Sequence, residues 1–130
     1  MAITYRIDPS TRTLHTTCAG AVMLPDVFAH FDALQRDPLA YGPLDVVLDF
    51  THVTTLPDAA QLRTVAARIG EAPLVFGACA IAAASDALFG IARMFEVFAE
   101  GQFRAVRVFR ELGQAQAWLE AQQQARGASG

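Results

Sequence analysis

The spacing of apolar residues changes at Leu24, and this change constrains the fold more than any other feature. Near the N-terminus Ile3, Tyr5 and Ile7 alternate with polar residues, which is the period of a half-buried strand. From Leu24 to Leu34 apolar residues recur every three or four positions, which is the period of a helix. A chain with both periods must bury helices against a sheet, so the sequence predicts an α/β domain.

The same two signals place the remaining elements. Two N-terminal strands are predicted around a turn at residues 8–11, and the helix that follows should end near Asp37, because Pro38 disfavours helical geometry before it. Gly70 and Gly101 are expected to end the second and third helices. The later strands and helices are predicted at residues 44–50, 58–70, 78–84, 86–100, 104–109 and 112–121. The order ββαβαβαβα predicts a five-stranded mixed sheet that is parallel over its last three strands.

Length and composition fit this single domain. The chain has 130 residues, of which 53% are hydrophobic and 18% charged, a balance that favours folding over disorder. We expect residues 1–121 to form the domain. Residues 122–130, which begin with three glutamines and end in glycine, alanine and serine, are predicted to form a disordered tail.

Charge and cysteine content exclude several classes of partner. The net charge is −3 and the ten basic residues, all arginine, do not cluster, which argues against a nucleic-acid partner. No apolar run approaches the ~18 residues of a membrane span, and no leader pattern begins the chain. Cys18 and Cys79 lie in apolar stretches and suit buried, reduced thiols. These features predict a cytoplasmic protein without a membrane span.

Polar residues follow the three predicted parallel strands. Ligands of open α/β sheets gather outside the carboxyl ends of such strands. The residues expected there are Asp49, Thr51, His52, Thr54, Thr55, Asp58, Ser85, Asp86, Arg110 and Glu111. Seven of them form the first candidate interaction site, which we call the rim: Asp49, His52, Thr54, Thr55, Asp58, Ser85 and Asp86.

Two kinds of chemistry compete with helix capping at the rim. Asp49, Asp58 and Asp86 together offer the oxygen ligands that Mg²⁺ prefers, and His52 with Ser85 has the residue types of a hydrolase. Ser85 and the two later aspartates also stand where helices begin, and such residues accept hydrogen bonds from the first backbone N–H groups. Capping accounts for these residues best, so no metal, cofactor or catalytic residue is predicted.

The third predicted helix carries a second candidate surface. Its apolar residues span roughly 160°, which is wider than the ~100° stripe that one core contact needs. Either neighbouring helices cover the excess or it binds a second copy or another protein. The residues of this third-helix surface are Phe89, Met94, Val97 and Phe98.

The alanine-rich strand at residues 78–84 raises the question of an interior space. Its small side chains leave room above the sheet. Either large side chains fill this room or an apolar ligand occupies it. The aromatic residues available to fill it are Phe50, Phe76, Phe95, Phe103 and Phe109.

Four stretches of the chain resemble the SpoIIAA-like group of the STAS superfamily, which consists of short bacterial proteins with the same element order. They are Asp49-Phe50-Thr51-His52-Val53-Thr54, Phe89-Gly90-Ile91-Ala92-Arg93-Met94-Phe95, Val106-Arg107-Val108-Phe109-Arg110 and Ala115-Gln116-Ala117-Trp118-Leu119. The resemblance covers nearly the whole chain and implies a regulatory module that acts through protein contacts.

STAS domains that antagonise anti-sigma factors carry a phosphorylatable serine or threonine just after an aspartate at the start of the second helix. Asp58 matches that aspartate, but Ala59 and Ala60 follow it. The resemblance therefore does not extend to a phosphorylation switch at this position. The SpoIIAA-like group is also similar in architecture to CRAL-TRIO lipid-transfer domains, which supports the apolar-ligand hypothesis by analogy.

The leading hypothesis is a non-enzymatic STAS-like module that binds a protein partner, which the sequence does not identify, or a second copy of itself. It would use the rim and the third-helix surface. The alternative is a protein that binds a small apolar molecule or lipid between the helices and the alanine-rich strand. A hydrolase that uses His52 and Ser85 is a weaker alternative.

Overall fold

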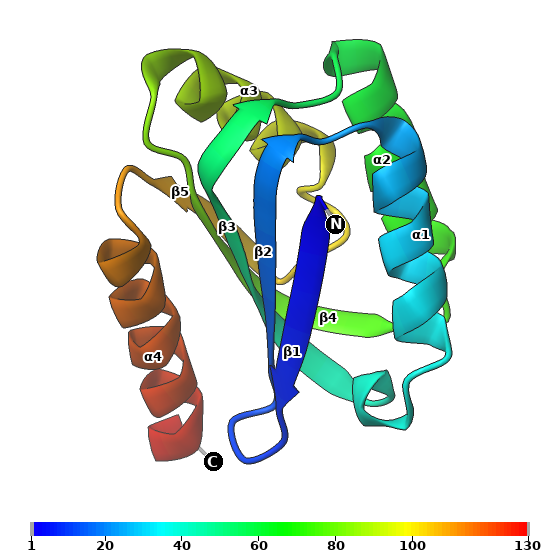
Figure 1. Ribbon diagram of the computed structural model, residues 1–130. Coiled ribbons are helices and arrows are strands. Elements are labelled where there is room, and N and C mark those ends of the chain that lie inside the picture. Colours follow the sequence, from blue (N-terminus) through cyan, green and yellow to red (C-terminus); the bar gives the residue numbers. More distant parts are fainter. Residues whose placement is uncertain (1, 130) are drawn as a thin grey trace.

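The computed structural model describes residues 2–129 and is an α/β fold with one sheet between two layers of helices (Figure 1). The strands are β1 (Ile3–Asp8), β2 (Thr13–Ala21), β3 (Pro43–Thr55), β4 (Val75–Ala82) and β5 (Ala105–Phe109). The helices are α1 (Leu24–Gln35), α2 (Ala59–Glu71), α3 (Asp86–Phe98) and α4 (Leu112–Ser129), with a short 3₁₀ turn at Pro38–Ala40.

The sheet has the order β1-β2-β3-β4-β5. β1 pairs with β2 in antiparallel fashion, and every later pair of neighbouring strands is parallel. This confirms the predicted element order and the mixed five-stranded sheet. Parallel neighbours need a crossover connection, which is why a helix separates each strand from β2 onward.

The two faces of the sheet are covered unequally. In Figure 1, α1, α2 and α3 lie on one face and α4 lies alone on the other. The alternation of strand side chains sends Cys79 and Ile81 of β4 toward the three helices, and its alanines toward α4. Ala78, Ala80 and Ala82 pack there against Ala115 and Leu119 of α4. The small side chains of β4 therefore accommodate the close approach of α4.

β3 is longer than the sequence predicted. The segment after Phe50 was expected to be a loop because it is polar, but the strand continues to Thr55. Its pairing with β2 explains this extension, since Ala19 lies opposite His52 and Ala21 lies opposite Thr55. Three rim residues, His52, Thr54 and Thr55, therefore lie in a strand.

Two helices also run past their predicted ends. α2 continues through Gly70 to Glu71, and the N–H of Ala72 closes it by bonding the carbonyls of Arg68 and Ile69. The prediction of a disordered tail from residue 122 was wrong for the part that the structure describes, because α4 extends to Ser129. Gly130 lies outside the described residues. Gln123 and Arg126 tie this last part of α4 to Asp45 of β3.

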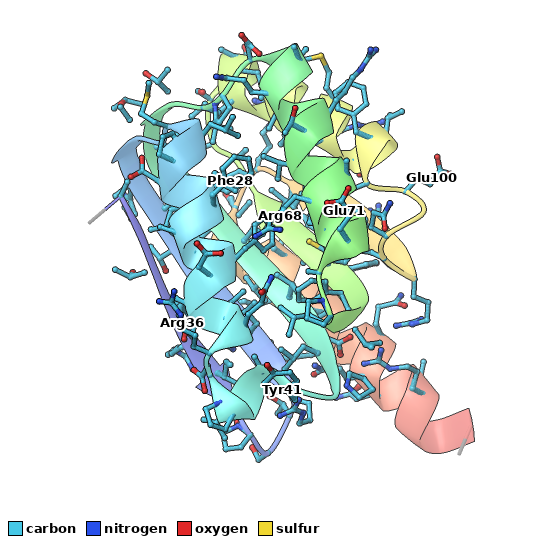
Figure 2. The ribbon with its side chains drawn as sticks, turned by 90° about the vertical axis from the view of Figure 1, so that its right-hand side faces the viewer. Phe28, Arg36, Tyr41, Arg68, Glu71 and Glu100 are labelled. Atoms are coloured by element: carbon cyan, nitrogen blue, oxygen red, sulfur yellow. The ribbon has the colours of Figure 1, made fainter. Side chains whose placement is uncertain are left out.

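α1 and α2 lie side by side over the sheet (Figure 2). Phe28 and Arg68 lie between the two helices in this view. One nitrogen of Arg68 is 3.3 Å from a carboxylate oxygen of Asp32. The Arg68 side chain is 35% exposed and the Asp32 side chain is 50% exposed. An exposed ion pair of this kind contributes little to stability, so α1 depends mainly on its apolar contacts.

Candidate functional site

The polar groups of the rim serve the local backbone. Asp58 begins α2, and its Oδ1 accepts a hydrogen bond of 2.9 Å from the N–H of Gln61. Ser85 begins α3, and its Oγ accepts one of 3.2 Å from the N–H of Leu88. These are the capping roles that the sequence predicted for both residues.

Asp49 is bound within its own strand, whereas Asp86 is bound to a residue that follows β5. Oδ1 of Asp49 accepts hydrogen bonds from the backbone N–H and the hydroxyl of Thr51, at 2.9 and 2.6 Å. Asp86 forms an ion pair with Arg110 at 2.6 Å on the surface. The Arg110 guanidinium also lies 4.1 Å from the ring centre of Phe89, so it joins the start of α3 to the end of β5.

The rim residues do not form a common centre. Within residues 2–129 no three histidine, cysteine, aspartate or glutamate side chains are grouped so that they hold a metal ion, so Asp49, Asp58 and Asp86 are not brought together. In the same part of the chain no hydrogen bond joins His52 to Ser85, whose hydroxyl accepts from the first turn of α3. The hydrolase hypothesis therefore has no contact on which to rest.

Only part of the third-helix surface is exposed to solvent. Val97 is 65% exposed and Met94 is 39% exposed. Phe89 and Phe98 are half-buried, and each lies beneath an arginine: Arg110 over Phe89, and Arg63 of α2 with its guanidinium 5.0 Å from the ring centre of Phe98. Two of the four predicted residues thus remain available to a partner.

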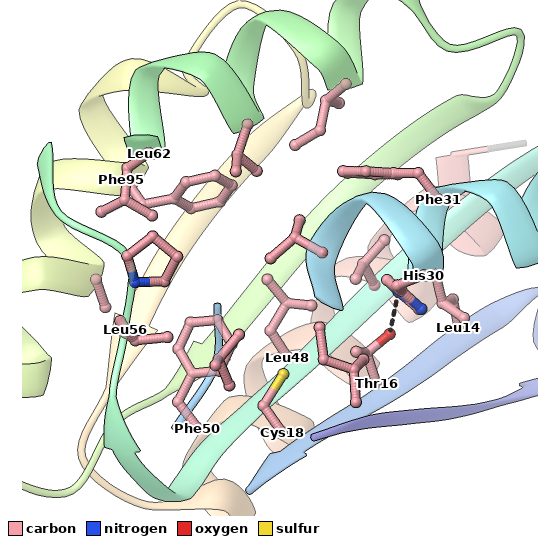
Figure 3. Close-up of a pocket in the computed structure, with 18 of the residues that line it drawn as sticks. Leu14, Thr16, Cys18, His30, Phe31, Leu48, Phe50, Leu56, Leu62 and Phe95 are labelled. Carbon is pink, nitrogen blue, oxygen red and sulfur yellow. Dashed lines mark hydrogen bonds between the residues drawn. The ribbon is translucent and has the colours of Figure 1, made fainter. Parts of the chain in front are cut away.

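A cavity of about 100 Å³ lies inside the layer between the sheet and α1, α2 and α3 (Figure 3). Its walls come from strands β1 to β4, from the loop after β3 and from all three of these helices. Representative lining residues are Leu14, Val46, Leu48, Phe50, Leu62 and Phe95. This space is the strongest candidate for a binding site in the described part of the chain, because close-packed interiors contain few voids larger than a water molecule.

The cavity is not where the sequence placed it. The expected space lay above the alanine-rich strand, but the alanines of β4 face α4 and the cavity lies beside β2 and β3. Four of the aromatic residues that were expected to fill the interior do border it: Phe50, Phe76, Phe95 and Phe103. Phe109 lies on the other face, where its ring packs against Trp118.

Three side chains of the cavity wall carry a heteroatom: Thr16, Cys18 and His30. The Thr16 hydroxyl and Nε2 of His30 are 3.3 Å apart and form a hydrogen bond, drawn as a dashed line in Figure 3. Burial lowers the pKa of His30 to about 4. Burial, followed by the charge of Asp49, raises the pKa of Cys18 to about 12. The cavity wall is therefore uncharged at neutral pH.

His30 was not among the candidate residues that the sequence indicated. A signal was present, because His30 follows Val27 by three positions and precedes Leu34 by four, which puts it on the apolar stripe of α1. Thr16 likewise stands between Leu14 and Cys18 in the inward-facing series of β2. A polar residue within an apolar stripe is the pattern that marks both.

A second hollow, of about 360 Å³, lies between β1 and α1, and we call it the β1–α1 groove. Residues that line it include Ile3, Tyr5, Asp26, Ala29, His30 and Ala33. Ile3 and His30 line both the groove and the cavity. The two hollows are therefore neighbours that share these side chains as a common wall.

Two further findings bear on function. None of the helices in residues 2–129 combines the length and apolar character needed to cross a membrane. Comparison with models of protein families and with curated protein sequences found no match to this chain.

Proposed function

We propose that this protein binds a small apolar molecule in the cavity between the sheet and helices α1, α2 and α3. The observation that carries the proposal is a space of about 100 Å³ whose wall is almost wholly aliphatic and aromatic. Atoms that line an apolar void lack van der Waals partners on one side. A ligand that fills the void supplies these contacts.

The volume limits the size of the ligand. An engineered apolar cavity of ~150 Å³ admits benzene or xenon, whereas sites for drug-sized molecules begin at ~300 Å³. A cavity of about 100 Å³ suits a compact molecule of roughly the size of benzene or less. A lipid chain would need the walls to move, so the volume favours a small ligand over a lipid.

Burial of the ligand sets the expected affinity. Each buried methylene group contributes about 0.8 kcal/mol, so a six-carbon ligand gains about 5 kcal/mol. This corresponds to a Kd on the order of 0.2 mM before any cost of opening the wall. Titrations should therefore reach millimolar concentrations of ligand.

The test is a titration with benzene, and with xenon under pressure, followed by NMR of the methyl groups. Shifts should concentrate at Leu14, Leu48 and Leu62, which line the cavity, and should saturate. Ala92→Leu adds carbon atoms at a buried position in the cavity wall and should abolish the shifts. Ala87→Leu makes the same change at an exposed position of α3 and should leave them intact. Unsaturable shifts, or equal shifts in both variants, would contradict the proposal.

A second candidate function rests on the third-helix surface. The exposure of Val97 and Met94 favours contact with a protein, as the resemblance to the SpoIIAA-like group implies. The specific form of this hypothesis is a homodimer. Sedimentation analysis of the wild type should then show dimers that Val97→Asp dissociates and that Ala87→Asp, on the same helix, preserves. A wild-type monomer up to millimolar concentration would rule the homodimer out.

A further inference from the structure

The wall between the interior cavity and the β1–α1 groove is formed by two side chains. Ile3 comes from β1 and His30 from α1, and each of them lines both hollows. Figure 3 shows the His30 ring directed toward Thr16 at one side of the cavity.

We propose that the groove is the entrance to the cavity, with Ile3 and His30 as its gate, and that the complete site takes a medium-chain alcohol. The apolar end of this ligand occupies the cavity and its hydroxyl lies in the groove. This inference rests on the proposed function, because it assumes that the cavity binds an apolar group.

The position of the gate in the molecule supports an entrance here. β1 is an edge strand that pairs only with β2, so nothing in the sheet covers its outer side. Ala29 and Ala33 lie one turn apart on α1 and border the groove, and their short side chains leave the space open. Of the α1 side chains only Phe31 and Leu34 are buried, and Leu24 and Val27 pack against the core while partly exposed.

The His30 ring is held by few interactions. Its hydrogen bond to the Thr16 hydroxyl is 3.3 Å long, at the weak end of the normal range. Its other close contacts are with aromatic rings: Tyr5, edge-on with the ring centres 5.5 Å apart, and Phe31 at 6.1 Å. A change of the His30 rotamer breaks one polar contact and opens the cavity to the groove.

The charges beside the groove select the polar end of the ligand. Asp26 borders the groove, and the Tyr5 hydroxyl that faces this region donates a 2.8 Å hydrogen bond to Asp37. His30 adds no positive charge at neutral pH, since burial keeps its pKa near 4. The Asp26 carboxylate at the groove repels a fatty-acid anion, whereas a hydroxyl donates to a carboxylate or accepts from a neutral donor.

The experiment compares three probes at pH 7: benzene, 1-heptanol and heptanoate. Benzene fits the cavity alone and reports the proposed function. 1-Heptanol should bind at least tenfold more tightly than heptanoate, which has a chain of the same length. Calorimetry supplies the affinities, and NMR line shapes supply the exchange rate of benzene.

Two variants test the route. Ala29→Phe places a ring at an exposed position bordering the groove and should slow benzene exchange at least tenfold without changing its Kd. His30→Ala removes half of the gate and should speed exchange. Ala87→Phe, exposed on α3, is the control and should match the wild type.

The outcomes separate the two proposals. Benzene binding with unchanged exchange in Ala29→Phe would overturn the entrance and leave the proposed function standing. Benzene binding with equal affinities for 1-heptanol and heptanoate would overturn the ligand class. Absence of benzene binding would overturn the proposed function and this inference together.

Discussion

Arg126 of α4 bonds both oxygens of the Asp45 carboxylate in β3, 81 residues earlier in the chain. The same carboxylate accepts hydrogen bonds from the N–H of Ala78 at 2.9 Å and the side-chain amide of Gln123 at 3.0 Å. Burial alone would raise the pKa of Asp45, but the hydrogen bonds, of which that from Arg126 is the largest, lower it. Asp45 therefore stays charged and fixes the last turns of α4 to the sheet.

A chain that ends at Ala121 should be destabilised by roughly 2–4 kcal/mol, because Asp45 then stays buried without two of its partners. Urea unfolding measures this loss. The double change of Gln123 and Arg126 to alanine in the full chain should reproduce most of it. Gln124→Ala, at an exposed position of the same helix, should have no effect. Equal stability of the shortened and full chains would restore the tail interpretation.

Gly77 and Gly90 should respond oppositely to alanine. A Cβ at Gly77 would clash with Oδ1 of Asp45, which is held in place, so we expect a loss of about 1–3 kcal/mol. A Cβ at Gly90 meets nothing within 4 Å, and alanine inside α3 should gain about 0.5–1 kcal/mol. Thermal unfolding of the two variants gives the signs. A Gly77→Ala protein as stable as the wild type would show that the carboxylate can move.

His30 should make the protein sensitive to mild acid. Its pKa is about 4 in the folded state and 6.5 without perturbation, so the unfolded chain binds more protons between these values. Stability should therefore fall by up to roughly 3 kcal/mol as the pH drops from 6.5 to 4. His30→Phe should remove this part of the loss, as urea unfolding at several pH values would show. The pKa of His15 is also lowered, by burial and then by Arg6. Because His15 is present in both the wild type and His30→Phe, its contribution to the pH dependence is the same in the two proteins. Parallel pH curves would contradict the prediction.

The two thiols should differ in their access to a small apolar reagent. Both are buried and have raised pKa values, which slows reaction of either. Cys18 lines the cavity and Cys79 does not, so methyl methanethiosulfonate should modify Cys18 first. Mass spectrometry of the single-cysteine variants measures both rates. Equal rates would mean that both thiols react only through global unfolding.

The order of elements was predictable because each has a local period. The extension of β3 was not, because the polar stretch around His52 is held by its pairing with β2 rather than by its own burial. The end of α4 was missed for a related reason. Three consecutive glutamines resemble a tail, and what orders them is Asp45, which a local reading does not connect with residue 123.

The candidate site also has one part that the sequence predicted and one part that it did not. Topology correctly identified the rim as the place where helices begin, and it predicted the capping by Asp58 and Ser85. The cavity depends on how well side chains from four strands and three helices fit together, and no local pattern encodes a void. The alanine-rich strand β4 led to a wrong prediction of where the space lies, because its alanine side chains point to the face of the sheet that α4 covers.

The contacts of Asp45 also bear on how the protein is made. Gln123 and Arg126 are synthesised 78 and 81 residues after it. At ribosomal speeds of about 5–20 residues per second, the nascent chain holds this carboxylate unmatched for about 4–16 s. The β3–β4 region emerges early, yet its native packing is completed only when the last turns of α4 arrive.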